Sequence, residues 1–280
     1  MGLEVRSGDE LVGSAIVRPE QGMDFIDFIY ARSGPDRSEL FDSLLEWCCG
    51  RLASTGLTRI VYAAFAYWRK ESFPKDLSGA FLRRGFSTYR AVYLGHPLDP
   101  PPAVTPIAPG YEVHLFADDR VEEAARMMLR CPEPEAIYWD HGLCTRSIEG
   151  AAAPTLPRFP HGLGQMVVWR DWAGSADRCS ETAGAPATAG STVSRDGVAP
   201  IVAFSLATLS GYVNHVYTLP EHRSKGLASS VITRVLQAVH GRGHKRATIL
   251  THETNPGAIR LYQRLGFRTL FTYPQFFVRR

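Results

Sequence analysis

The residues best suited to chemistry lie in a basic, glycine-containing turn in the last quarter of the chain. The turn is Arg223–Ala228 (RSKGLA). It follows a segment with strand character and precedes apolar residues at helical spacing. The first amides of a helix have no partner within the helix and attract anions. Gly226 would let the backbone approach a phosphate, and Arg223 and Lys225 add charge. We therefore predict a pyrophosphate site. The alternative is an ordinary turn with solvated basic residues.

The second segment of interest is Asn255–Phe267 (NPGAIRLYQRLGF). Its first two residues suit a helix start, and Gly266 suits a left-handed helix stop. The chain then continues as an apolar strand over 267–278. The residues expected on the buried face of this helix are Ala258, Leu261, Tyr262 and Leu265.

In this order and at this spacing, the two segments resemble the GCN5-related N-acetyltransferase (GNAT) family. The family's pyrophosphate loop, Q/R-x-x-G-x-G/A, matches Arg223, Gly226 and Ala228. Its second motif, N-x-x-A-x-x-L-Y-x-x-x-G-F, matches residues 255–267 at every specified position. The motif-bearing core covers about a quarter of the chain. The resemblance implies an α/β (α+β) fold with a mixed, mostly antiparallel sheet flanked by helices.

The resemblance also implies acetyl transfer from acetyl-CoA to an amine by direct attack in a ternary complex. In the family, the fourth and fifth strands separate and the pantetheine arm lies between them. Strand backbone groups then hold the arm and polarise the thioester, and the turn holds the pyrophosphate. The implied cofactor-binding residues are Val216, Tyr217, Thr218, Arg223, Ser224, Lys225, Gly226, Leu227, Ala228, Ser229, Asn255, Ala258 and Tyr262.

Tyr262 is the candidate general acid, because it follows Ala258 by about one helical turn and would face the cofactor. A core tyrosine packed on its own helix is the alternative. No general base is assigned. Tyr212 and His215 are the candidates, His252 and Glu253 lie near the relevant strand ends, and a water chain is equally possible.

The N-terminal third repeats the same order of predicted elements, which indicates an internal duplication. Gly85-Phe86 corresponds to Gly266-Phe267, and Phe81 stands where Tyr262 stands. The corresponding turn, 35–40, has no glycine and carries acids instead. We expect a degenerate copy that binds no cofactor. Its predicted elements are a hairpin over 3–17, strands at 25–30, 58–66 and 89–94, and helices at 38–53 and 77–84.

The sequence therefore predicts two GNAT-like domains. Residues 1–95 form the truncated, degenerate domain, and residues 96–110, with six prolines, form a stiff linker. Residues 111–280 form the catalytic domain, in which 173–200 is a flexible insert by composition. The irregular segment 131–164 carries acids and borders the acceptor in the family, although a solvated loop is the alternative.

Composition limits the remaining possibilities. The 280 residues carry a net charge of +3, but residues 212–280 hold eleven Lys and Arg against two acids. A phosphate-rich cofactor accounts for this bias, so we expect no nucleic-acid partner. No apolar run is long enough to span a membrane, the N-terminus is not a signal peptide, and the five cysteines form no C-x-x-C motif. A cytoplasmic enzyme without a metal is expected, with its oligomeric state open.

Two further functions remain open at this stage. One is a non-catalytic acyl-CoA-binding or regulatory module, which the intact Gly226 and Tyr262 disfavour. The other is a transferase that uses a different acyl-CoA. The acceptor is expected to be a small-molecule or peptide amine, since fold alone does not specify it.

Overall fold

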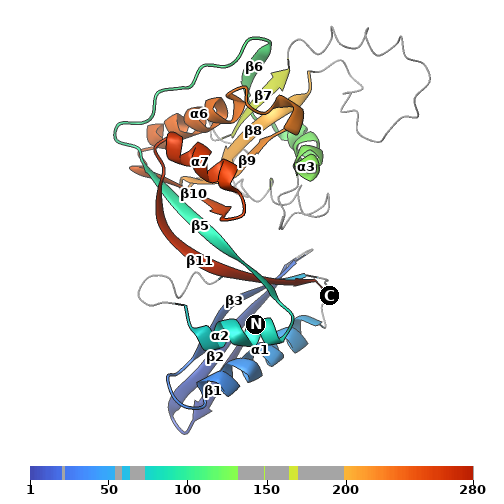
Figure 1. Ribbon diagram of the computed structural model, residues 1–280, viewed down its shortest axis with the longest axis vertical. Helices are drawn as coiled ribbons and strands as arrows, with labels where there is room; N and C mark the ends of the chain where they lie inside the picture. The colour runs from blue at the N-terminus through green and yellow to red at the C-terminus, as the bar shows by residue number, and fades with distance from the viewer. Residues whose placement is uncertain are drawn as a thin grey trace, which may run out of the picture. The chain divides into compact units, whose positions relative to one another are not determined.

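The computed structural model describes residues 1–20, 23–53, 59–63, 73–131, 148, 164–169 and 199–279 (Figure 1). The chain divides into two compact units. The first contains Met1–Tyr93, Thr251–Pro256 and Thr269–Arg280. The second contains Leu94–Leu250 and Gly257–Arg268.

The first unit is a mixed sheet with two helices. Three antiparallel strands are followed by a helix and by a fourth strand parallel to the third. Strand order is β1-β2-β3-β4-β11-β5. The elements are β1 (Gly2–Ser7), β2 (Glu10–Glu20), β3 (Met23–Ala31), α1 (Arg37–Ala53), β4 (Arg59–Ala63), α2 (Lys75–Arg83), β5 (Ser87–Pro97) and β11 (Arg268–Arg279).

The last strand, β11, lies in the first unit. It pairs antiparallel with β4 from Gln275–Ala63 to Arg279–Arg59, and so lies between β4 and β5. The sequence predicts this strand itself but counts it with residues 111–280. Sequence alone could not show that β11 pairs in the first unit, because an apolar strand fits either sheet equally well.

An aromatic stack fills the core of the first unit. The Phe81 ring stacks on the rings of Tyr62 and Phe276, at centroid distances of 4.8 and 4.5 Å, and these two rings lie 6.4 Å apart. Phe86 contacts the Phe81 ring edge-on at 5.0 Å. Phe81 has no exposed surface, so the residue that corresponds to Tyr262 in the first copy is a core residue.

The second unit has strand order β5-β10-β9-β8-β7-β6, and its share of β5 is Leu94–Pro97. β9 and β10 are parallel, whereas the pairs β6–β7, β7–β8 and β8–β9 are antiparallel. Its elements are β6 (Tyr111–Leu115), η1 (Asp118–Arg120), α3 (Val121–Arg130), β7 (Gly164–Trp169), β8 (Ile201–Ala207), β9 (Tyr212–Thr218), η3 (Pro220–His222), α6 (Leu227–Gly241), β10 (Arg246–His252, to Leu250 in this unit) and α7 (Pro256–Arg264, from Gly257).

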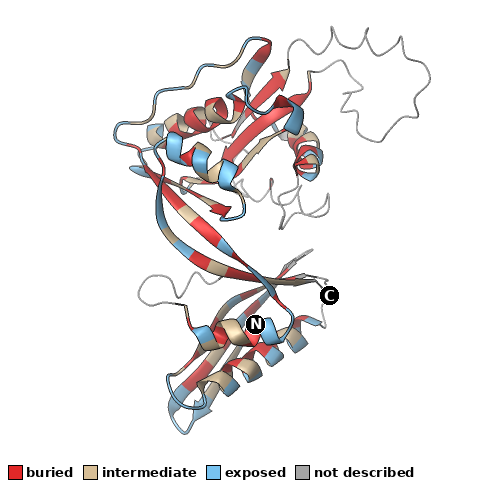
Figure 2. Cartoon of the chain, in the orientation of Figure 1, coloured by how far each residue is buried: buried red, intermediate tan, exposed pale blue. Residues whose placement is uncertain are grey.

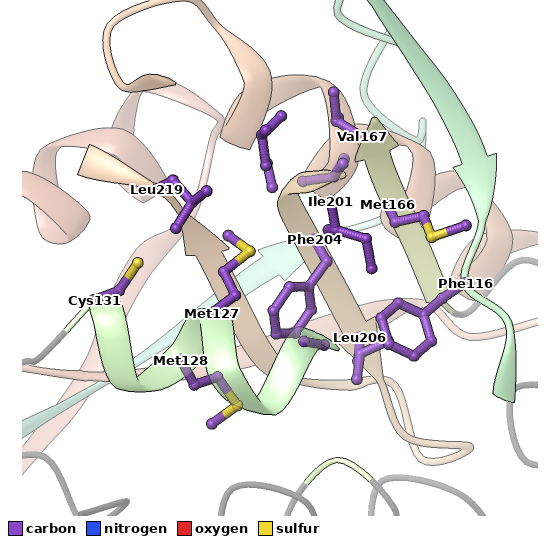
Figure 3. Close-up of a cluster of buried hydrophobic side chains, with 14 of the residues drawn as sticks. Phe116, Met127, Met128, Cys131, Met166, Val167, Ile201, Phe204, Leu206 and Leu219 are labelled. Carbon is purple, nitrogen blue, oxygen red and sulfur yellow. The ribbon is translucent and has the colours of Figure 1, made fainter. Parts of the chain in front are cut away.

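The core of the second unit is built around β8. All seven residues of this strand are buried (Figure 2). Side chains of α3, β6–β7 and β8 meet there, with Met127, Phe116 and Phe204 among them (Figure 3). Burial of these side chains stabilises the sheet that carries the candidate site.

Helix α2 of the first copy and helix α7 of the second copy end in the same way. After α2, Gly85 has φ +77° and the amide of Phe86 donates to the Phe81 carbonyl at 3.1 Å. After α7, Gly266 has φ +95° and the amide of Phe267 donates to the Tyr262 carbonyl at 3.0 Å. Left-handed glycine stops of this kind satisfy the last helical carbonyls. The matching stops support the internal duplication.

The proline-rich segment runs along α6. The Thr105 amide donates to Thr233 Oγ1, and Ser230 Oγ donates to the Thr105 carbonyl, both at 3.0 Å. Gln237 Nε2 donates to the Pro102 carbonyl at 2.6 Å. Residues 96–110, expected as a linker, are therefore part of the second unit and supply partners for buried hydroxyls of α6. Among the described helices, none is long and apolar enough to cross a membrane.

Candidate functional site

The candidate site begins where β9 and β10 part. Within the described strands, their parallel register consists of Tyr212–Thr248 and Val213–Ile249. The register of β9 with β8 continues to Thr218. Asn214 is the extra residue of a bulge, because Leu206 pairs with His215 and the next β8 residue pairs with Val213. A bulge bends its strand, which fits the separation of β9 from β10.

The basic turn has the backbone shape expected of an anion-binding turn. Ser224 has φ +62° and Gly226 has φ +76°, on either side of Lys225. A Cβ added at Gly226 would meet no atom within 4 Å, so the positive φ, rather than lack of space, calls for glycine here. Ser224 adopts the same left-handed region although it has a side chain, which costs conformational energy. Strain of this kind concentrates at functional sites.

Helix α6 begins at this turn, and its first backbone amides could bind an anion. Gly226 is its N-cap and makes no side-chain capping bond, and the first turn contains no acid. The first helical hydrogen bond in this turn is donated by the Ser230 amide to the Gly226 carbonyl, at 3.0 Å. The preceding amides, of Leu227 to Ser229, are donors that suit a phosphate. The donor set therefore fits the pyrophosphate predicted from the sequence.

The two basic side chains of the turn are held by protein partners. Arg223 Nε donates to the Thr218 carbonyl at 3.3 Å. Lys225 Nζ donates to the hydroxyl of Tyr111 at 2.8 Å, and that hydroxyl lies 3.0 Å from Nδ1 of His222. Both basic residues are exposed, so their charge is available at the surface of the turn. Sequence reasoning missed Tyr111 and His222, because nothing in linear spacing connects a strand residue to a turn that lies so far along the chain.

Burial and charge lower the pKa of His222. Burial has the largest effect, and the Lys225 ammonium adds to it. Nearby, Cys131 donates its thiol to the Thr218 carbonyl at 3.4 Å. Burial raises the pKa of this thiol, against the opposing effect of Arg223. Cys131 is thus a neutral packing residue beneath the turn.

The structure separates the β9 candidates by exposure. Val216, Tyr217 and Thr218 are half-buried at the end of β9 nearest the turn. The Tyr217 ring packs on Phe204 of the core at 5.5 Å, so only its backbone is placed for the predicted role. Among the base candidates, His215 is 1% exposed and lies 3.1 Å from Asn214 Nδ2, whereas Tyr212 is half-buried.

Tyr262 is the one buried residue of α7, at 6% exposure. Its ring lies 5.8 Å from that of Phe267. Ala258, Leu261 and Leu265 are only half-buried, so the predicted four-residue buried face is wrong. Helical spacing predicted the face, but it could not show that only Tyr262 of these four is covered.

Asn255 and the two remaining candidates lie in the first unit. Asn255 is half-buried just before α7, and its amide donates to the His252 carbonyl at 3.0 Å. The His252 ring packs on Tyr89 at 4.2 Å, and burial lowers its pKa to about 4. The Glu253 carboxylate accepts from the Arg90 amide at 3.3 Å. His252 and Glu253 therefore make structural contacts with β5.

Two predicted segments fall outside the described residues. They are most of 131–164, expected near the acceptor, and most of 173–200, expected as a flexible insert. Among the described residues, no group of three or more His, Cys, Asp or Glu could hold a metal ion.

Comparison with known proteins finds a family match in the C-terminal part of the chain. Residues 193–275 match the family described as FR47-like protein. A 60-residue stretch is 35% identical to the N-alpha-acetyltransferase MAK3 of Arabidopsis thaliana, and covers 21% of this chain and 32% of that protein. The match thus spans about a third of the relative's length.

Solved structures share the fold over nearly the whole chain. A GCN5-related N-acetyltransferase from Sphaerobacter thermophilus is 16% identical, with a TM-score of 0.63 over 97% of this chain and 78% of that one. A tandem GNAT protein from the clavulanic acid biosynthesis pathway is 14% identical, with a TM-score of 0.57 over 99% and 82%.

The separating parallel strands, the basic turn and the α7 segment thus occur on the fold of GCN5-related N-acetyltransferases. The C-terminal part of the chain thus resembles acetyltransferases in sequence, and the fold of the chain matches that of a tandem GNAT protein.

Proposed function

We propose that the chain is an N-acetyltransferase that binds acetyl-CoA at the N-terminus of α6 and transfers the acetyl group to an amine. The observation that carries the proposal is the turn Arg223–Gly226. It combines two positive φ angles, two exposed cations and a helix start without a side-chain cap. It also follows β9, the strand that separates from β10. These features together favour a pyrophosphate-binding turn over an ordinary turn with solvated basic residues.

Each element has a distinct role in this proposal. The turn and the first amides of α6 bind the pyrophosphate, with Ala228 and Ser229 in the first helical turn. Backbone groups of Val216 to Thr218 orient the arm of the bound cofactor. When bound, acetyl-CoA supplies an activated acetyl thioester. A fixed backbone donor on β9 would stabilise the charge that develops on the carbonyl oxygen.

We assign Tyr262 as the group that protonates the departing thiolate. Its ring is buried and fixed against Phe267, so the hydroxyl would be held in one position. Direct attack by the amine in a ternary complex needs no covalent enzyme residue. The base is Tyr212, His215 or a water chain, and the half-buried Tyr212 is the more accessible of the two side chains.

The acceptor class follows only from a relative. The stretch shared with an N-alpha-acetyltransferase favours the amino group of a peptide N-terminus, so N-terminal peptides lead the acceptor panel. Small amines and aminoglycosides complete it. The proposal places this reaction in the cytoplasm.

Thiol release from acetyl-CoA across this panel tests the proposal. We expect release that depends on one class of amine and that fails with Gly226→Asp. Binding of acetyl-CoA without release for any amine would favour the non-catalytic acyl-CoA-binding module. Faster release from another acyl-CoA would change the donor and leave the site assignment intact.

A further inference from the structure

One side chain contacts the basic turn at two points. Tyr111 is the first residue of β6, and its hydroxyl lies 2.8 Å from Lys225 Nζ and 3.0 Å from His222 Nδ1. His222 immediately precedes the turn, and Lys225 is its third residue. The two contacts therefore bracket Ser224, whose φ is +62°. A single hydroxyl links both ends of the strained part of the turn.

The directions of the two hydrogen bonds follow from the groups involved. An ammonium only donates, so the Tyr111 oxygen accepts from Lys225. The phenolic proton is then free to be donated to Nδ1 of a neutral His222. Burial lowers the pKa of His222, which favours the neutral ring that this arrangement needs. The hydroxyl thus has a distinct partner for each of its two functions.

The platform beneath the turn is rigid. Tyr111 and Trp169 pair directly across β6 and β7. The His222 ring contacts both edge-on, at centroid distances of 5.8 Å from Tyr111 and 5.1 Å from Trp169. Tyr111 and His222 are 8% and 6% exposed. Paired strands and buried rings leave little freedom for the side chains that hold the turn.

We infer that Tyr111 is a positioning residue that sets the turn Arg223–Gly226 in its anion-binding shape before the cofactor arrives. The inference rests on the proposed function. A turn already ordered loses less conformational entropy on binding, so the gain is in affinity for the cofactor. Tyr111 touches no reacting group in this scheme, so turnover at saturation should be independent of it.

Tyr111→Phe removes only the hydroxyl and keeps the ring beneath Lys225, whose Nζ lies 5.4 Å from the ring centroid. Isothermal titration with coenzyme A should show Kd raised roughly tenfold, in line with a hydrogen bond to a charged group. The KM for acetyl-CoA should rise by a similar factor, with kcat changed by less than about twofold. Tyr89→Phe, a buried tyrosine of β5, is the matched control and should change neither constant.

A double-mutant cycle tests whether Tyr111 acts through the turn. Tyr111→Phe and Lys225→Met should each weaken coenzyme A binding. The double variant should then weaken it by less than the product of the two effects, since they remove the same contact. Lys225 is exposed, so its variant should fold even if Tyr111→Phe does not. In that case, hydrogen exchange of residues 222–230 in ligand-free Lys225→Met should be faster than in the unmodified protein.

Each outcome has a defined meaning. An unchanged Kd in Tyr111→Phe, a fall in kcat with KM constant, or unaltered hydrogen exchange in Lys225→Met would overturn the inference and leave the proposed function standing. If the unmodified protein does not bind coenzyme A at all, the proposed function itself fails, and the inference fails with it.

Discussion

His96 occupies the space into which a side chain at Gly266 would project. A Cβ built on Gly266 lies 2.9 Å from His96 Nε2, and the His96 ring contacts Phe267 edge-on at 5.2 Å. His96 lies in β5, whereas Gly266 ends the helix that carries Tyr262. In the second unit, a residue near the end of β5 thus contacts the end of the predicted catalytic helix.

Gly266→Ala should destabilise the protein through both backbone strain and this contact. Gly85 provides a matched control, because it ends α2 with φ +77° but has no atom within 4 Å of an added Cβ. Gly85→Ala should cost only the left-handed strain, about 1–2 kcal/mol. Gly266→Ala should cost about 1–3 kcal/mol more, the usual range for overpacking. Urea unfolding midpoints of the two variants give the comparison, and equal midpoints would mean that His96 moves aside freely.

Gly226→Asp should abolish acetyl-CoA binding. The substitution places a carboxylate beside the predicted pyrophosphate and forces a side chain into φ +76°. Calorimetry should find one site per unmodified chain. Arg37→Ala is the control, since the equivalent turn of the first copy lacks glycine, and it should leave affinity unchanged. Two equivalent sites would contradict the view that the first copy is degenerate.

Tyr262→Phe should lower turnover by about two to four orders of magnitude, the range for loss of a general acid. The ring stays packed on Phe267, so the Kd for acetyl-CoA and the melting temperature should hardly change. A lower melting temperature with full turnover per folded molecule would instead assign Tyr262 to the core. Steady-state kinetics and thermal unfolding on this one variant separate the two roles.

Phe81→Tyr should not create a second active site, and it should destabilise the first unit. Phe81 has no exposed surface, and its ring stacks on those of Phe276 and Tyr62 at centroid distances of 4.5 and 4.8 Å, so the new hydroxyl would be buried. Burying a hydroxyl without a partner costs about 1–3 kcal/mol in proteins. The expected result is a lower unfolding midpoint with acetyl-CoA stoichiometry still at one, measured by denaturation and calorimetry.

Stability should fall as the pH drops from about 6.5 to 4. His252 has a pKa of about 4 when folded, against an ordinary value of 6.5, so the unfolded chain binds its proton first. The folded state therefore keeps the full contribution of His252 to stability above pH 6.5. Protonation of His252 lowers the free energy of unfolding by about 3 kcal/mol between pH 6.5 and pH 4. His252→Gln should flatten the pH dependence of the urea midpoint over this range. Part of the slope should remain, because burial also lowers the pKa of His96 and His222.

The sequence predicted much of the fold because local signals were strong. Helix stops at Gly85 and Gly266, and the turn at Gly226, all have the positive φ that favours glycine. Strand pairing and contacts between distant residues could not be predicted from the sequence. The pairing of β11 with β4 depends on which sheet edge is open, and the contact of Tyr111 with Lys225 joins residues 114 positions apart. The half-exposed Leu261 shows the same limit, since helical periodicity gives a face but not what covers it.

The placement of β11 has a consequence for biosynthesis and for evolution. β4 leaves the ribosome long before β11 is translated, so the first unit stays an incomplete sheet until nearly the whole chain has emerged. Domains that fold as units generally do so in order of synthesis, but here the earlier copy must wait for the later one. A gene fragment that encodes either copy alone would lack or misplace a strand. A gene split between the two copies would therefore remove this strand from the sheet of the first unit.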